Sequence, residues 1–110
     1  MSQAAVKTNN TRRVVITGLG VVSPLGCDVE TFWRGIVGCE SGAVEIDRFD
    51  HTDFKTHFAC QVSGFTLPTD DPRKYRNLDL FTQYALVAAI EAYASSGLEI
   101  DRESPHRLGV

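Results

Sequence analysis

The stretch VVITGLGVVSPLG, residues 14–26, places three glycines directly behind an apolar run. The run itself, RVVIT at residues 13–17, is rich in β-branched side chains and ends at a glycine, a pattern that predicts a buried strand. A glycine-rich turn between a strand and a helix either holds a phosphate or lets two backbones approach closely. The residues that follow the turn decide between these roles.

The glycine pattern does not match a nucleotide-binding loop. A dinucleotide fingerprint needs G-x-G-x-x-G, but Ser23 stands where the third glycine belongs, and no G-K-[ST] follows as in a Walker loop. Pro24 has no N–H to donate, and the Asp28 carboxylate stands at the helix N-terminus where a phosphate would bind. The pattern therefore favours close backbone packing, with nucleotide binding by an oxidoreductase as the weaker alternative.

Strand and helix signals continue along the chain. Asp28 is a good N-cap, and Gly38 supplies a stop for a first helix, while residues 38–56 are expected to form an irregular connection. HFACQVSGF, residues 57–65, alternates as a half-exposed strand does, and a second helix is expected over about residues 78–96, closed by Gly97. The apolar stripe of the first helix consists of Val29, Phe32, Trp33, Ile36 and Val37.

The second helix indicates that the domain is incomplete. Its only charge between Leu80 and Leu98 is Glu91, and a helix that is apolar on all sides must be covered on more than one of them. A further strand is expected to begin at HRLGV, residues 106–110. The βαβα order predicts an α/β class with a largely parallel sheet, of which only the N-terminal portion is present.

Composition and the titratable residues exclude several classes of function. The 110 residues are 43% hydrophobic and 23% charged with a net charge of −3, which argues against a membrane span and bulk nucleic-acid binding. Residues 1–11 are expected to be a disordered polar tail without a leader pattern, so the expected compartment is the cytoplasm. Cys27, Cys39 and Cys60 match no zinc spacing and are expected to be free thiols, and no metal site is predicted. The three histidines, His51, His57 and His106, are expected to be exposed and unrelated to one another.

Four motifs in order carry a family resemblance. RRVVITGLGVVSPLG, then Phe32-Trp33 with GCESG, then FACQVSGF, then RNLDLFTQYALVAAIEAYASSGL together resemble the N-terminal part of a β-ketoacyl-[acyl-carrier-protein] synthase of the elongating type. The resemblance covers residues 12–110 as one incomplete domain. It implies a thiolase-like fold of layered helices and sheets (αβαβα), a homodimer, and an acyltransferase of fatty acid biosynthesis that needs no cofactor.

The resemblance also implies that this segment holds no catalytic residue. The reaction is a decarboxylative condensation of malonyl-carrier protein with an acyl chain on a cysteine, assisted by two histidines that lie, like the nucleophile, beyond the matched region. Cys60 is not expected to be catalytic, because Gln61 follows it and the segment is typical of a strand interior. The isolated segment is therefore predicted to be inactive and poorly folded.

One cluster of basic residues is a candidate binding site. Arg73, Lys74 and Arg76 stand just before the second helix, where the helix dipole makes cations unfavourable by about 0.3–1 kcal/mol each, so helix stability does not explain them. In the resembled family, basic residues at this place help dock the acidic acyl carrier protein. Asn77 and Leu80 depart from the family pattern, and a solvated loop without a partner remains an equal alternative.

A second candidate function is a polyketide ketosynthase or its non-catalytic chain-length partner subunit. The residue at the nucleophile position would separate the two, because cysteine supports the enzyme and glutamine the partner subunit.

Overall fold

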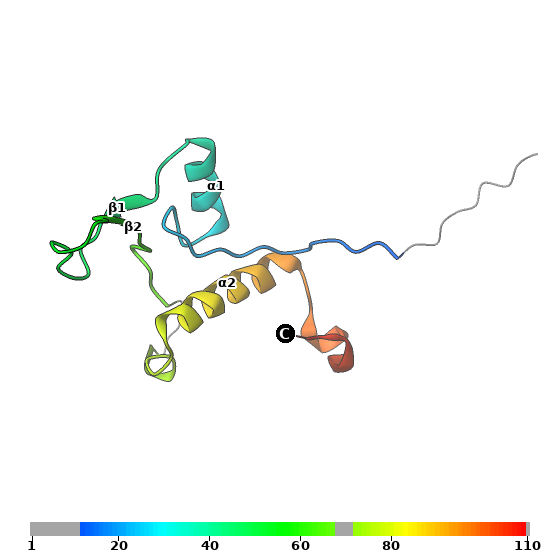
Figure 1. The fold of residues 1–110 in the computed structure, drawn as a ribbon. Coiled ribbons are helices and arrows are strands. Elements are labelled where there is room, and N and C mark those ends of the chain that lie inside the picture. The colour runs from blue at the N-terminus through cyan, green and yellow to red at the C-terminus, as the bar shows by residue number, and fades with distance from the viewer. Residues whose placement is uncertain (1–11, 68–71, 110) are drawn as a thin grey trace, which may run out of the picture.

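The computed structural model describes residues 12–67 and 72–109, and within them it is a small mixed α/β arrangement (Figure 1). The expected tail at residues 1–11 lies outside the described residues. Within these two ranges, two α-helices, one two-stranded sheet and three short 3₁₀ turns follow one another along the chain. In order they are α1 (Val29–Val37), β1 (Ala43–Glu45), β2 (Phe58–Cys60), η1 (Pro72–Lys74), α2 (Leu80–Ser96), η2 (Ile100–Arg102) and η3 (Pro105–Arg107).

Helix α1 begins and ends at the predicted residues. Asp28 has extended backbone (φ −152°), and its Oδ1 accepts a hydrogen bond from the Thr31 N–H at 2.8 Å. At the other end the Gly38 N–H donates to the Arg34 carbonyl at 2.8 Å. The left-handed residue is not Gly38 but the next one, Cys39, with φ 54°. A non-glycine residue therefore holds the strained position after α1.

Helix α2 ends as predicted, at a left-handed Gly97 with φ 70°. It begins two residues later than the expected bounds, after Asp79, whose side chain makes no cap hydrogen bond. Just before the helix, the Leu78 carbonyl accepts a hydrogen bond from the Gln83 side-chain amide at 2.8 Å. None of the helices among the described residues is long and apolar enough to cross a membrane.

The glycine stretch packs on the backbone of α2, and the prediction of close packing is confirmed. A Cβ on Gly20 would strike the Ala88 carbonyl and lie 2.8 Å from the Ala92 nitrogen, and one on Gly18 would lie 2.9 Å from Ser96 Cβ. In Figure 1 the N-terminal segment accordingly runs across α2. Only residues without a side chain allow this approach.

The prediction of a largely parallel sheet is wrong for the described residues. Strands β1 and β2 pair antiparallel, with Val44 opposite Ala59. Strand β1 lies inside the segment expected to be irregular, and β2 is shorter than the alternating segment predicted. The connection between them doubles back on itself, so it brings two sequential strands together without the crossover that parallel pairing requires.

Two further predicted strands are also not formed. Residues 13–17 pair with no strand among the described residues, and Val14 and Ile16 are 95% and 81% exposed. The residues before Val110 form the 3₁₀ turn η3 rather than the start of a strand. A β-branched segment becomes a strand only when a neighbour accepts its backbone hydrogen bonds.

Few side chains are buried. Among the described apolar residues only Val87 counts as buried, and Trp33 and Phe81 are 62% and 71% exposed. In α2, Leu80, Ile90 and Tyr93 are also 43–45% exposed, so the expectation that the elements present do not fully cover this helix is confirmed for the described residues.

Candidate functional site

The centre of the described structure is a carboxylate on α2 that joins the glycine stretch to α1. Glu91 accepts hydrogen bonds from two backbone N–H groups, that of Val21 at 2.9 Å through Oε2 and that of Val29 at 2.8 Å through Oε1. Val29 is the first residue of α1, so the negative charge also lies at the positive end of that helix. One turn further along α2, the Ser95 hydroxyl accepts from the Leu19 N–H at 3.2 Å and donates to the Leu19 carbonyl at 3.1 Å. We call Glu91 and its two backbone partners the Glu91 clamp.

The Glu91 clamp leaves no phosphate cradle at the glycine stretch. The N–H groups that an anion would need at Val21 and Val29 already donate to Glu91, and that of Thr31 donates to Asp28. Two carboxylates at the N-terminus of α1 would also repel a phosphate. The nucleotide-binding alternative therefore has no support from this geometry.

Asp28 is a stabilised anion. The Thr31 backbone N–H, and then the Thr31 hydroxyl at 2.8 Å, donate to its carboxylate and lower the pKa of Asp28 below its usual range. Hydrogen bonds to the charged form favour that form. The N-terminal cap of α1 is therefore ionised at neutral pH.

The three basic residues gather where the chain enters α2. Arg73 and Lys74 lie in the 3₁₀ turn η1, and Arg76 follows in the turn before the helix; all three side chains are exposed. Lys74 Nζ lies 5.6 Å from the centre of the Tyr75 ring, a cation–π distance. In the first turn of α2, the Phe81 side chain is 71% exposed. We call Arg73, Lys74 and Arg76 the basic cluster.

The cysteines are free thiols, as predicted. Cys60 lies in β2 and is exposed, and Cys39 follows the C-terminal end of α1. Cys27 is half-buried and its thiol lies 3.7 Å from the Ser63 carbonyl oxygen. None of the three is placed at a helix N-terminus beside a base, which is the arrangement that activates a thiolate.

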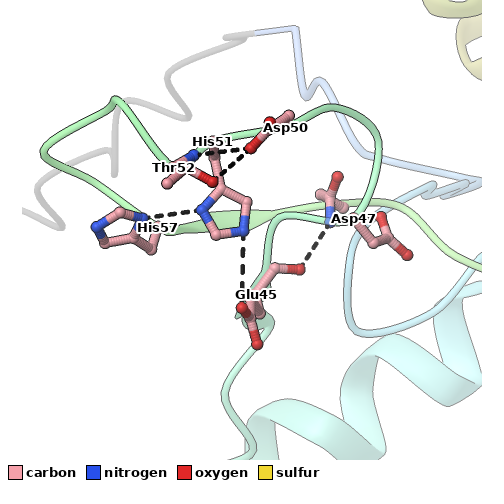
Figure 2. A network of polar contacts seen from close by, with 7 residues as sticks. Glu45, Asp47, Asp50, His51, Thr52 and His57 are labelled. Carbon is pink, nitrogen blue, oxygen red and sulfur yellow. Dashed lines mark hydrogen bonds and ion pairs between the residues drawn. The ribbon is translucent and has the colours of Figure 1, made fainter.

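The histidines correct one expectation. His51 and His57 were expected to be unrelated, but their Nδ1 atoms lie 2.8 Å apart, and Glu45 Oε1 lies 3.6 Å from His51 Nε2 (Figure 2). The side chain of His51 is only 18% exposed. The six-residue separation gave no signal, because the fold of the intervening loop decides which side chains meet. No group of three or more histidine, cysteine or acidic side chains in residues 12–67 and 72–109 is placed to hold a metal ion.

Glu91, by contrast, is conspicuous in the sequence. It is the single charge in an otherwise apolar helix, and a half-buried carboxylate needs partners. Its partners are backbone groups some seventy positions away, so no side-chain motif could identify them.

Comparison with known protein families identifies the family of this chain. Residues 11–110 match the family described as beta-ketoacyl synthase, N-terminal domain, and the chain belongs to that family. The family is one of thiolase-like fold, of which the described residues form a small mixed α/β part.

Among individual proteins, the chain is 45% identical over 100 residues to a 3-oxoacyl-[acyl-carrier-protein] synthase 2 of Vibrio cholerae. It is 44% identical to one of Coxiella burnetii and 39% identical to one of Staphylococcus aureus, again over 100 residues. Each match covers 90% of this chain and 24% of the relative. The chain thus spans about a quarter of the length of the curated relatives it matches.

Proposed function

We propose that this chain supplies the N-terminal part of a 3-oxoacyl-[acyl-carrier-protein] synthase of fatty acid biosynthesis. The observation that carries the proposal is the match over 100 residues at 45% identity to a protein of that name, together with the family match over residues 11–110. The enzyme is an acyltransferase that condenses malonyl-carrier protein with a bound acyl chain and releases carbon dioxide.

In that enzyme these residues would stabilise the fold and bind the carrier protein. The cysteine nucleophile and the two assisting histidines belong to parts of the family beyond the matched region, and the thiols described above lack an activating partner. The Glu91 clamp fixes the glycine stretch and α1 against α2, where the three segments would form one corner of the layered αβαβα fold. The residues 13–17 would become a strand when the neighbouring strands of the complete sheet accept their backbone hydrogen bonds.

A direct assay tests the enzymatic proposal. The full chain that carries this segment, incubated with acyl- and malonyl-carrier protein, is expected to yield 3-oxoacyl-carrier protein by mass spectrometry and to release carbon dioxide. The 110-residue segment alone is expected to yield none. A full chain with glutamine at the nucleophile position and without product would instead support the non-catalytic partner of a polyketide ketosynthase.

The basic cluster is proposed to dock the carrier protein. The support is its exposure, its place before α2 where cations do not stabilise the helix, and the exposed Phe81 in the first turn of that helix. Exposed cations mainly accelerate and orient the encounter with an acidic partner. The synthase is further proposed to be a cytoplasmic homodimer, as the family resemblance implies.

A charge-matched pair of variants tests the docking proposal. Lys74→Glu with Arg76→Glu is expected to slow association with the carrier protein by about tenfold or more at low salt, and less at high salt. The control, Arg12→Glu with Arg13→Glu, changes the net charge equally at two exposed residues of the N-terminal segment, outside the basic cluster. Equal slowing in both pairs would show a general charge effect and contradict a local docking site.

A further inference from the structure

The loop between β1 and β2 holds two imidazoles in a fixed relation. The Ile46 N–H donates to the His57 carbonyl at 3.0 Å and continues the β1–β2 pairing into the loop. The Phe54 N–H donates to the His51 carbonyl at 3.0 Å, which closes a turn between the two histidines. The backbone thus brings His51 and His57 to the same side of the loop, as Figure 2 shows.

Side chains brace the same loop. The Asp50 carboxylate accepts from the Thr52 N–H at 3.0 Å and from the Thr52 hydroxyl at 2.6 Å. The rings of Phe49 and Phe54 meet edge to face with centroids 5.6 Å apart. These contacts do not involve the imidazoles, so the loop keeps its shape when the ring nitrogens change partner.

A carboxylate lies beside one of the rings, with Glu45 Oε1 3.6 Å from His51 Nε2. One Nδ1 atom donates a proton to the other across 2.8 Å, and the tautomers decide which ring is the donor. When the donor ring carries its proton on Nε2 instead, both Nδ1 atoms present a lone pair. His57 is exposed, so its Nε2 can hold this proton in contact with solvent.

We propose that His51 and His57 bind a divalent transition-metal ion, Cu²⁺ most strongly, through their two Nδ1 atoms. Neutral imidazole is a preferred ligand of Ni²⁺, Cu²⁺ and Zn²⁺, and of these three ions Cu²⁺ generally binds most tightly to a given site. With metal–nitrogen bonds of about 2.0–2.1 Å, two nitrogens around one ion lie roughly 2.9–3.4 Å apart, depending on the bond angle. The observed 2.8 Å needs to open by about half an ångström at most, and both rings have to turn, because their Nδ1 atoms now face each other and have to point at a common ion instead. His57 is exposed, so its ring is free to make the larger part of this turn.

Glu45 occupies the place of an orienting partner. Histidines that bind metals usually direct their other ring nitrogen to a carboxylate or carbonyl, which fixes the ring and its tautomer. No third protein donor faces the pair among the described residues, because the Asp50 carboxylate is engaged by Thr52. Water completes the coordination, so the site is open and of modest affinity. The inference does not depend on the proposed enzymatic function.

Copper titration of the full chain tests the proposal. In isothermal titration calorimetry with Cu²⁺ alone, His51→Asn and His57→Asn are each expected to weaken the binding of one Cu²⁺ per chain by about tenfold or more. Each substitution removes one of the two imidazole ligands. The matched control His106→Asn, in η3, is expected to leave that equivalent unchanged. Electron paramagnetic resonance is expected to show coupling to two imidazole nitrogens in the parent and to one in each single variant.

The conservative change at Glu45 adds a second readout. Glu45→Gln is expected to weaken copper binding by no more than about tenfold, because the carboxylate is 83% exposed and acts only through the His51 ring. Circular dichroism of each variant reports its fold. Unchanged copper affinity in a folded His57→Asn chain, equal loss in His106→Asn, or no binding by the parent would overturn the proposal.

Discussion

Replacing Glu91 by alanine is expected to loosen the junction of the glycine stretch, α1 and α2. The substitution removes both acceptor oxygens, so the N–H groups of Val21 and Val29 lose the partners they have at 2.9 and 2.8 Å. Neither helix changes its own hydrogen bonds. The effect should therefore be local to the contact between segments that are 62 and 70 positions apart.

The size of the effect follows from the chemistry of the contact. A hydrogen bond to a charged group contributes about 1.5–3 kcal/mol when buried. Both bonds are only partly buried, so water replaces part of what is lost. We expect a loss of about 2 kcal/mol in the free energy of unfolding for Glu91→Ala, and about 1 kcal/mol for Glu91→Gln, which keeps one acceptor oxygen.

Urea unfolding and amide hydrogen exchange of the full chain measure this. With a urea dependence of about 2 kcal/mol per molar, the midpoint for Glu91→Ala should fall by roughly 1 M, and the amides of Val21 and Val29 should exchange faster. The matched control is Glu99→Gln, which breaks only an exposed ion pair with Arg102 and should change stability by less than about 0.5 kcal/mol. Glu91→Ala that matches the parent in both measurements would refute the reasoning.

Three further substitutions have expected outcomes in urea unfolding of the full chain. Gly20→Ala forces a Cβ into the backbone of α2 and should destabilise by about 1–3 kcal/mol, whereas Gly109→Ala, with open space around it, should not; equal effects would contradict close packing. Cys39→Gly should raise stability by about 1 kcal/mol by relieving the left-handed backbone at φ 54°, and a loss would argue against strain there. The pKa of Asp28 is lowered by the Thr31 N–H, so its contribution is present above the ordinary carboxyl pKa of about 4 and is lost as pH falls through the folded value. Asp28→Asn should therefore flatten the stability profile below about pH 4, and a profile as steep as the parent's would contradict this cap.

Both helices could be predicted because their signals are local. The Asp28 cap, the Gly38 stop and the left-handed Gly97 each act within one turn of the residues they terminate. The close packing of the glycine stretch could also be predicted, since Pro24 and Asp28 argue against an anion.

The strands could not be predicted equally well, because pairing depends on residues distant in sequence. The β-branched run at residues 13–17 has strand propensity but no partner among the described residues, while Ala43–Glu45 pairs with β2 without a strong signal of its own. Contacts between distant residues also limited the prediction of the sites. Glu91 stands out in the sequence as a single charge, but its backbone partners could not be predicted. His51 and His57 meet only because the loop between them turns back.

Residues 12–110 are proposed to act as the N-terminal part of a carrier-protein-dependent synthase. A chimera tests it most directly: these residues replace the matching segment of the Vibrio cholerae synthase 2 relative, and condensation of acyl- and malonyl-carrier protein is measured by mass spectrometry. The chimera is expected to fold and to form 3-oxoacyl-carrier protein, at a rate that falls when Lys74→Glu and Arg76→Glu are introduced. A chimera that folds as its parent does but forms no product would contradict it.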